Sequence, residues 1–487
     1  MASFDFDIGI LGGGAAGLTV ASGSAQLGAK TLLIEKEPVL GGDCLHYGCV
    51  PSKTLIKSAH VYHQMRNADH FGLPSLDLPP VDFSKIAARI AEVIATIQVH
   101  DSVERFCGLG AKVEFGNAEF VDEHSVRLGG KTVSAATWVV ATGSSPVAPL
   151  FKGLDRTPYI TNKEVFSLKR LPASLIVLGG GPIACEMAQA FARLGSHVEV
   201  VQRSNQILSK EDKNMANMVM DAMAREGVVF HLGASVIEIR DEEGTREVEI
   251  ELGNGDRRTV RGDTLLVALG RQPNVEGLKL ENAGVKPGQG GLDVDARMRT
   301  GQKHIFAAGD VTGRYQFTHA AGYEGGIVIS NAVFHLPRKA DYTNLPWCTY
   351  TWPELASVGL NEKRARLAGL DVEVYTESFS TNDRALAENE TEGGIKLLLA
   401  KGKPVGVQIA GPHAGELISE WVAAQAGGVK LSAIAGAMHP YPTLAEINKR
   451  VVGNYLGPKI FSNKIRGALG FFFNYKGNAC TMGDDGK

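Results

Sequence analysis

The sequence predicts an α/β fold in which one strand, turn, helix and strand unit occurs twice and an α+β region follows. Two glycine-rich turns predict the repeated unit, because an apolar strand precedes each turn and a helical segment follows it; they lie at 12–17 and 179–184. After residue 343, aromatic residues and prolines open a third region in which strands and helices alternate. The 487 residues exceed one compact core, so about two to four packed domains are expected.

Composition and charge limit the kinds of partner. Lys and Arg number 50 and Asp and Glu number 53, which gives a formal net charge of -3 at pH 7. A nearly neutral chain gives no electrostatic reason to expect nucleic acid or an anionic membrane surface as a partner. Hydrophobic residues make up 44% of the chain and charged residues 21%, as in ordinary globular proteins. A small-molecule substrate is therefore expected.

No targeting or membrane-spanning segment is recognisable in the sequence. The first residues lead directly into an apolar strand, without a basic segment or a small-residue cleavage site. The longest apolar runs, such as Gly470–Phe473, are far shorter than the roughly 20 residues that cross a bilayer. We therefore expect a cytoplasmic protein without membrane contact.

The first glycine-rich turn predicts a nucleotide site. Gly12, Gly14 and Gly17 have the G-x-G-x-x-G spacing, in which missing side chains let the turn close and let a pyrophosphate approach the backbone at a helix N-terminus. This spacing alone is a weak signal. Its context strengthens it, because Glu35 ends the next strand, where a carboxylate can accept both hydroxyls of a ribose.

The second turn repeats the pattern and bears on the choice of cofactor. Gly179 and Gly181 are followed by Ala184 at the third position, a change that the pattern permits because this residue serves helix packing. Gln202 stands where an acid would select the ribose of NAD, and Arg203 follows it. Since no carboxylate there repels a 2′-phosphate and a cation is present, NADPH is favoured over NADH.

The remaining segments divide the chain further. Residues 83–107 have helical periodicity, 111–142 alternate as strands do, and prolines at 146, 149 and 158 indicate a crossing between domains. In the third region, strands are expected at 372–379 and 395–410, and helices at 415–426, 431–437 and 443–456.

Two cysteines follow the first nucleotide unit closely and are the candidate reactive residues. Cys44 and Cys49 are separated by four residues that include a glycine, so the chain between them can bend enough for a disulfide. A zinc site would need two more ligands at matching spacing, and the sequence has none. A structural disulfide stays open as an alternative, but a nearby cation, Lys53, favours a reactive pair. Cys107, Cys185 and Cys348 are expected to be buried core thiols.

The segment Gly41–Lys53 resembles the active-site motif of the class I pyridine nucleotide-disulfide oxidoreductases, the family of glutathione reductase, dihydrolipoamide dehydrogenase and mercuric reductase. Three further segments resemble family motifs: 141–146, 270–274 and 305–310. The resemblance implies two Rossmann-like FAD/NAD(P)-binding domains plus a C-terminal α+β dimerisation domain, in a homodimer. The implied domains are an FAD-binding domain at 1–152 and 272–342, an NAD(P)-binding domain at 153–271, and a dimerisation domain at 343–487.

The resemblance also implies roles for individual residues. Electrons would pass from the nicotinamide through FAD to the Cys44–Cys49 disulfide, with Cys49 beside the flavin and Cys44 free to attack a substrate. Lys53 would pair with Glu186 beside the flavin, and Asp310 would bind the ribityl chain. The implied FAD-binding residues are Gly12, Gly14, Gly17, Glu35, Gly42, Thr142, Gly143, Gly309 and Asp310, and those for the nicotinamide nucleotide are Gly179, Gly181, Gln202, Arg203 and Gly270.

The chain departs from the family where its catalytic acid is expected. Disulfide reductases of the family place a His there, followed five residues later by a Glu; this chain has Tyr441 and Glu446 in that register. A phenol, with a pKa near about 10, is a poor proton donor at neutral pH compared with an imidazole. His439 is an alternative donor, although we expect it to be an ordinary exposed loop histidine.

The Pro-Tyr pair at 440–441 resembles the mercuric reductase branch, in which a soft metal ion replaces the disulfide substrate. From this sequence we expect neither the metal-binding N-terminal domain nor the C-terminal pair of adjacent cysteines of that branch, since only Cys480 stands near residue 487. Asp43 stands where a Thr is usual and His46 where Asn is frequent, and the sequence offers no physical account of either change.

These patterns predict an FAD-dependent NAD(P)H oxidoreductase that acts on a thiol-reactive acceptor, which is a disulfide, a soft metal ion or a quinone. A dihydrolipoamide dehydrogenase-type enzyme is one alternative. A flavin-bearing redox sensor or binding protein is another, because adjacent aromatic residues at 471–475 can anchor a partner. No metal cofactor is expected.

Overall fold

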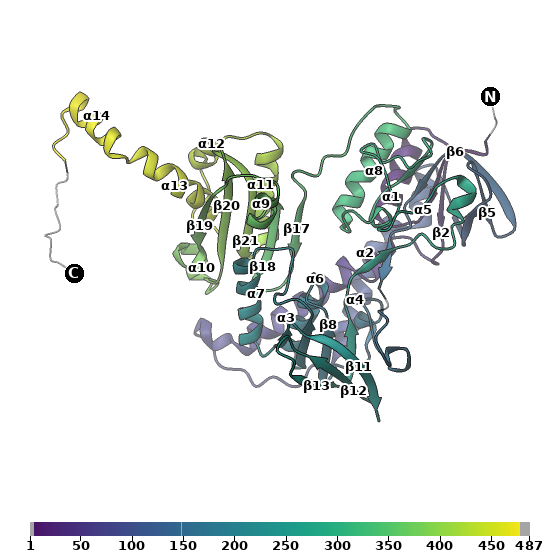
Figure 1. Ribbon diagram of the computed structural model, residues 1–487, viewed down its shortest axis with the longest axis horizontal. Coiled ribbons are helices and arrows are strands. Elements are labelled where there is room, and N and C mark those ends of the chain that lie inside the picture. The colour runs from purple at the N-terminus through teal and green to yellow at the C-terminus, as the bar shows by residue number, and fades with distance from the viewer. Residues whose placement is uncertain (1–3, 148, 478–487) are drawn as a thin grey trace. The chain divides into compact units, whose positions relative to one another are not determined.

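The computed structural model describes residues 4–147 and 149–477 (Figure 1). The chain divides into two compact units, Met1–Thr351 and Trp352–Lys487, and each is described by itself. The larger unit contains both glycine-rich turns. The mixed α/β architecture is the predicted fold class.

The N-terminal sheet has seven strands and holds the first glycine-rich turn. Its order is β3-β2-β1-β6-β5-β4, with β16 paired to β6. The strands β3, β2, β1, β6 and β16 are parallel, while β4 and β5 form an antiparallel extension. The bounds are β1 Phe6–Leu11, β2 Thr31–Glu35, β3 Ala111–Phe115, β4 Ala118–Phe120, β5 Ser125–Leu128, β6 Lys131–Val140 and β16 Ile305–Ala307. A segment near residue 305 thus completes a sheet whose other strands lie within 6–140.

Helices cover this sheet and carry the cysteine pair. Helix α1 (Ala15–Gln26) lies against α8 (Thr318–Ala332), as Figure 1 shows. The short helix α2 (Gly42–His46) holds Cys44, and Cys49 begins the long helix α3 (Cys49–Arg66). The predicted helical stretch at 83–107 is two helices, α4 (Phe83–Gln98) and α5 (Val103–Gly108). Within the sheet, Gly9 leaves room for the buried ring of Trp138, because a Cβ at Gly9 would lie 2.3 Å from that ring.

The second glycine-rich turn lies in a smaller parallel sheet of order β10-β9-β8-β14. Its strands are β8 Ser174–Leu178, β9 His197–Gln202, β10 Val229–Leu232 and β14 Thr264–Val267, and its helices are α6 Pro182–Leu194 and α7 Lys213–Arg225. An antiparallel sheet adjoins it, with β11 Ser235–Glu242, β12 Thr245–Glu251 and β13 Arg257–Gly262. The chain enters and leaves this region through two antiparallel strands that pair with each other, β7 (Ser144–Pro146) and β15 (Arg271–Pro273).

The C-terminal unit contains an antiparallel sheet with helices, as the alternating pattern predicted. The strands run in the order β18-β21-β20-β19 and span Glu354–Gly359, Lys403–Gly411, Gly394–Ala400 and Glu373–Ser378; β17 (Pro346–Thr349) precedes this unit. The helices are α9 Glu362–Leu367, α10 Asp383–Ala387, α11 Ala414–Ala426, α12 Leu431–Gly436, α13 Glu446–Ile460 and α14 Asn463–Phe473. Among the residues that the structure describes, no helix is both long and apolar enough to cross a bilayer.

Candidate active site

The first glycine-rich turn is closed by backbone contacts that only glycine allows. Gly12 has a φ of +109°, and a Cβ there would lie 2.3 Å from the carbonyl oxygen of Ala141. A Cβ on Gly17 would lie 1.8 Å from the carbonyl oxygen of Gly12, so a side chain would prevent α1 from starting here. The Glu35 carboxylate accepts a hydrogen bond of 2.6 Å from the Gly13 amide, which places it at the edge of the turn where a ribose would lie.

Gly14 and Gly42 bring two backbones together at the N-terminus of α1. Gly14 is the N-cap of α1, and no side chain caps that helix end. A Cβ on Gly42, which has a φ of +60°, would lie 2.8 Å from the Gly14 Cα. The free amides of a helix N-terminus in a cradle without side chains fit the pyrophosphate of FAD.

The other predicted flavin residues lie at the carboxyl end of the same sheet. The Asp310 carboxylate accepts a hydrogen bond of 2.6 Å from the Ser144 hydroxyl. Burial raises the pKa of Asp310, although the Ser144 hydrogen bond and the charge of Arg271 oppose that shift. The Gly309 amide donates to the buried carboxylate of Glu324 over 2.6 Å, which fixes the turn before Asp310. The residues present therefore fit a polar chain such as ribityl.

Thr142 and Gly143 join the two crossing strands. The Thr142 hydroxyl donates to the Asn274 carbonyl over 2.6 Å, and the Asn274 side chain donates back to the Thr142 carbonyl over 2.9 Å. The Asn274 amide donates to the Gly143 carbonyl over 2.9 Å. These bonds hold β7 and β15 together, so Thr142 and Gly143 have a structural task in this chain besides the predicted cofactor contact.

The second turn repeats the construction of the first. Gly179 has a φ of +114°, and a Cβ there would lie 2.4 Å from the Ala268 carbonyl oxygen. A Cβ on Gly180 would lie 3.0 Å from the Gln202 side chain, so Gln202 occupies the place that Glu35 has in the first turn. The space beside Gly181 is open. A helix N-terminus without side chains again fits a pyrophosphate.

The residues expected to select the nicotinamide nucleotide lie at the end of β9 and after β14. Gln202 donates to the Ser204 hydroxyl over 2.7 Å, and Arg203 is exposed. Gly270 has a φ of +118°, and its carbonyl accepts a hydrogen bond of 3.0 Å from the Val147 amide. Arg203, an exposed cation at the strand end with no ion pair to another described residue, fits a 2′-phosphate.

Cys44 and Cys49 are free thiols that hydrogen-bond to each other, and they are unequal. The hydrogen bond from Cys44, together with Thr318 and the charge of Lys53, lowers the pKa of Cys49 to about 6. The same bond and burial raise the pKa of Cys44. Cys49 is also the first residue of α3, where the positive end of the helix dipole stabilises a thiolate. Cys49 therefore carries the negative charge and Cys44 the proton.

Lys53 and Glu186 form the ion pair that the resemblance implied. The Lys53 Nζ lies 2.9 Å from a Glu186 oxygen, with side-chain exposures of 38% and 6%, so Glu186 is the buried partner. Burial alone would lower the pKa of Lys53, but the charge and hydrogen bond of Glu186 outweigh it and the pKa is raised. The other Glu186 oxygen accepts from the Tyr350 amide over 2.9 Å, and the Lys53 ammonium lies 4.3 Å from the centre of the Tyr350 ring.

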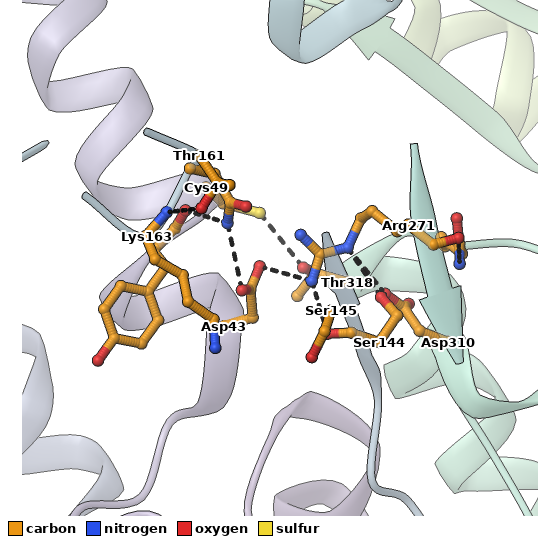
Figure 2. Close-up of polar contacts among 12 residues, drawn as sticks. Asp43, Cys49, Ser144, Ser145, Thr161, Lys163, Arg271, Asp310 and Thr318 are labelled. Atoms are coloured by element: carbon orange, nitrogen blue, oxygen red, sulfur yellow. Dashed lines mark hydrogen bonds and ion pairs between the residues drawn. The ribbon is translucent and has the colours of Figure 1, made fainter. Parts of the chain in front are cut away.

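Structural contacts account for the two departures that the sequence left unexplained. An Asp43 oxygen lies 3.1 Å from the Arg271 guanidinium, and Figure 2 shows Asp43 extending toward Arg271 beside Ser144 and Asp310. The His46 Nε2 lies 2.9 Å from the Leu40 carbonyl oxygen, so this imidazole ties the start of the cysteine segment to the chain before it.

The predicted acid segment lies in the C-terminal unit. Tyr441 is exposed, and its hydroxyl donates to the Asp383 carboxylate over 2.8 Å; that bond raises the pKa of Tyr441. Glu446 begins α13, and one of its carboxylate oxygens is buried without a hydrogen-bond partner among the described residues. The expectation for His439 was wrong, because its side chain is only 10% exposed and its Nε2 lies 3.1 Å from a Glu420 oxygen. Helix α12 packs against α13 and brings the loop after it beside α11.

The other cysteines only partly match expectation. Cys185 is buried, and burial raises its thiol pKa; Cys348 is half-buried, and Cys107 is exposed, which corrects the expectation for it. In α5 the buried side chain is Phe106, so its neighbour Cys107 faces solvent. Cys480 lies outside the described residues. No cluster of three or more His, Cys, Asp or Glu side chains that could hold a metal ion occurs within 4–147 or 149–477.

Sequence reasoning missed four residues at this site: Thr318, Tyr350, Asn162 and Arg271. Arg271 belongs to a quoted motif, so its type was visible although its partner was not. Thr318 is the first residue of α8 and reaches Cys49 from far along the chain, with Oγ1 to Sγ at 3.3 Å. No local sequence pattern predicts a contact between residues so far apart in the chain.

Comparisons with known proteins agree with this geometry. Residues 6–325 match the family model described as pyridine nucleotide-disulphide oxidoreductase, and residues 345–452 match its dimerisation domain. A mercuric reductase of Bacillus cereus is 33% identical over 447 residues, covering 91% of this chain and 70% of that protein. A dihydrolipoyl dehydrogenase of Bacillus subtilis (strain 168) is 34% identical over 450 residues, covering 90% of this chain and 96% of that protein.

A solved structure is similar across nearly the whole fold. The Cu(II) complex of the HOCl-induced flavoprotein disulfide reductase RclA from Escherichia coli matches with a TM-score of 0.83 and 28% identity, covering 93% of this chain and 99% of that chain.

The chain belongs to the pyridine nucleotide-disulphide oxidoreductase family. It is an FAD-dependent oxidoreductase with NAD(P)H as electron donor, and its dimerisation domain indicates a homodimer. Membership in a family of enzymes favours catalysis over the sensor alternative.

Proposed function

We propose that the enzyme passes electrons from NADPH through FAD to Cys44 and Cys49, and from them to a soft, thiol-reactive metal ion. The balanced reaction for a mercuric acceptor is NADPH plus Hg(II) to NADP⁺, a proton and Hg(0). When FAD is bound, it supplies the two-electron chemistry that connects the nicotinamide to the cysteine pair. Mercuric reductase and the Cu(II) complex among the similar proteins support this choice of acceptor.

The inequality of the two thiols is the observation that carries the proposal. Thr318 and the Lys53 charge stabilise the Cys49 thiolate, and Cys44 keeps its proton. In this proposal Cys49 faces the flavin and Cys44 meets the acceptor. A soft metal ion displaces that proton readily, because thiolate sulfur is its preferred ligand.

The state of Tyr441 favours a metal ion over a disulfide. Reduction of a disulfide leaves a thiolate that must be protonated, whereas reduction of a metal ion needs no proton from the enzyme. The Tyr441 hydroxyl donates a hydrogen bond to Asp383, and that bond raises the pKa of Tyr441, so Tyr441 is a weak acid toward a leaving thiolate.

A dihydrolipoamide-type disulfide is the second candidate acceptor. The pairing of His439 with Glu420 favours it, since a carboxylate-bound imidazole two residues before Tyr441 is a proton donor of the usual kind. Dihydrolipoyl dehydrogenase among the relatives supports it as well.

Steady-state turnover of the FAD-loaded enzyme with NADPH separates the two. We expect kcat/KM for Hg(II) or Cu(II) to exceed that for lipoamide by at least about tenfold, and we expect Cys44→Ser to abolish metal reduction. Faster turnover of lipoamide than of either ion would contradict the metal proposal. Metal reduction that survives in Cys44→Ser would show that the flavin reduces the ion without the cysteine pair.

We also propose that the FAD-binding domain comprises residues 1–152 and 272–342, the NAD(P)-binding domain 153–271 and the dimerisation domain 343–487. The pairing of β16 with β6 and of β7 with β15 supports the first two boundaries. A cytoplasmic location is proposed because a chain with free, reactive thiols suits a reducing compartment.

A further inference from the structure

Asp43 directly precedes Cys44, and its carboxylate joins two other parts of the chain. One oxygen lies 3.1 Å from the Arg271 Nη2, and the other accepts a hydrogen bond of 3.3 Å from the Asn162 side chain. A threonine, the usual residue at this place in the family, has neither the charge nor the second acceptor oxygen for both contacts.

Asn162 also holds the other end of the cysteine segment. Its side-chain amide donates to the Tyr47 carbonyl over 2.9 Å, and the residue is only 7% exposed. Within the segment, the Tyr47 amide donates to the Asp43 carbonyl over 2.8 Å. One buried amide therefore ties the residue before Cys44 to a residue near Cys49.

Ser144 holds the Arg271 guanidinium in place independently of Asp43. It donates to the Ser144 hydroxyl over 2.8 Å and to the Ser144 carbonyl over 2.7 Å, and its side chain is 12% exposed. The guanidinium also lies 3.9 Å from the Asp310 carboxylate, so one cation stands between two anions (Figure 2). We call Asp43, Asn162 and Arg271 the Asp43 clamp.

We propose that Asp43 is a positioning residue that holds the Cys44–Cys49 segment through the Asp43 clamp and sets the balance between the disulfide and dithiol forms of the pair. This inference rests on the proposed function, in which that pair is oxidised and reduced.

Two physical effects act in the same direction. Reduction adds two electrons and two protons to the disulfide, and at neutral pH the Cys49 thiol then gives up its proton and becomes an anion. Asp43 neutralises part of the Arg271 charge, 3.1 Å away, so its removal leaves more positive charge beside the segment, which favours the dithiol form with its Cys49 anion. The clamp also keeps the two sulfurs together, and a looser segment lowers the effective concentration of one thiol beside the other, which disfavours the disulfide.

The test measures this balance in the FAD-loaded, full-length protein. Wild type, Asp43→Asn and Asp43→Thr are equilibrated without oxygen in mixtures of reduced and oxidised dithiothreitol, in which the two thiols of the reagent become its cyclic disulfide as the protein disulfide opens. The samples are quenched with acid and alkylated, and the mass of the peptide with Cys44 and Cys49 is measured by mass spectrometry to count its thiols. Glu119→Gln is the matched control, because it removes the anion of an exposed ion pair with Arg127 in the β4–β5 hairpin.

We expect both Asp43 variants to shift the equilibrium at least about tenfold toward the dithiol, which is about 30 mV for a two-electron couple. Asp43→Glu keeps the charge and should return most of the way to wild type, and Glu119→Gln should not shift. Threonine is the usual residue at this position in the family, so Asp43→Thr is the variant to measure if Asp43→Asn does not fold. Values within twofold of wild type for the folded Asp43 variants, or a shift toward the disulfide, would overturn the role of Asp43. A wild-type pair that never changes its thiol count would instead refute the proposed function.

Discussion

The contact between Thr318 and Cys49 gives the sharpest prediction about thiol reactivity. The Thr318 hydroxyl lies 3.3 Å from the Cys49 sulfur, and because a thiolate has no proton the hydroxyl donates. With a pKa of about 6, Cys49 is roughly 90% thiolate at pH 7. Because the pKa is lowered, the thiolate is present above pH 6 and is lost as the pH falls through that value.

Thr318→Val removes the donor and keeps the shape. A hydrogen bond to a charged group contributes about 1.5–3 kcal/mol, and the lower end applies because Cys49 is exposed. At about 1.4 kcal/mol per pKa unit, the pKa of Cys49 should rise by about one unit. At pH 6 the thiolate fraction should then fall from about one half to about one tenth, and alkylation of Cys49 should slow about fivefold.

The assay is the rate of iodoacetamide labelling of Cys49 against pH in the reduced, FAD-loaded protein, followed by peptide mass. Thr132→Val is the control, because Thr132 is exposed on β6 and lies outside the site. A labelling midpoint in Thr318→Val that equals or falls below that of wild type would show that the Thr318 hydroxyl does not stabilise the Cys49 thiolate.

Three further predictions concern stability, cofactor choice and the missing acid. Arg193→Met should lower the free energy of unfolding by about 3 kcal/mol, because the buried Arg193 pairs with the half-buried Glu226, with side-chain exposures of 4% and 14%; a denaturant midpoint equal to that of wild type would show that the pair contributes nothing. Arg203→Glu should raise KM for NADPH about tenfold and leave KM for NADH nearly unchanged, and equal effects on both nucleotides would exclude contact with a 2′-phosphate. Tyr441→His should raise lipoamide turnover more than about tenfold, and no gain would mean that the acid is not the limitation.

The sequence was informative where a task is encoded within a few neighbouring residues. Gly12 and Gly179 each permit a turn with positive φ against a carbonyl oxygen, and that steric demand is visible as a glycine after an apolar strand. Glu35 and Gln202 were predicted to end the strand after each turn, because the residue at that position selects the ribose in this kind of unit. In the C-terminal unit, alternation predicted strands at 372–379 and 395–410, where β19, β20 and β21 lie, but it did not predict β18 (Glu354–Gly359).

The sequence was not informative where contacts join distant segments. Asn162 contacts Asp43 from 119 positions along the chain, and Arg271 contacts it from β15. No local sequence pattern predicts either contact. The environment of Cys107 was wrongly predicted because a cysteine is more often buried than exposed, and only the packing of α5 shows which face is inward. His439 was predicted to be exposed because it lies in a loop, yet its side chain contacts Glu420 on α11 and is only 10% exposed.

Anaerobic titration of the oxidised, FAD-loaded enzyme with NADPH shows whether electrons pass from the flavin to the Cys44–Cys49 pair, when thiols are counted by alkylation and peptide mass. Thiols should appear on Cys44 and Cys49 alone, two for each two electrons that pass the flavin. The long-wavelength absorbance of a thiolate against the flavin should accompany them and vanish in Cys49→Ala. Reduced flavin with an intact Cys44–Cys49 disulfide, or an absorbance band that persists in Cys49→Ala, would contradict this electron transfer.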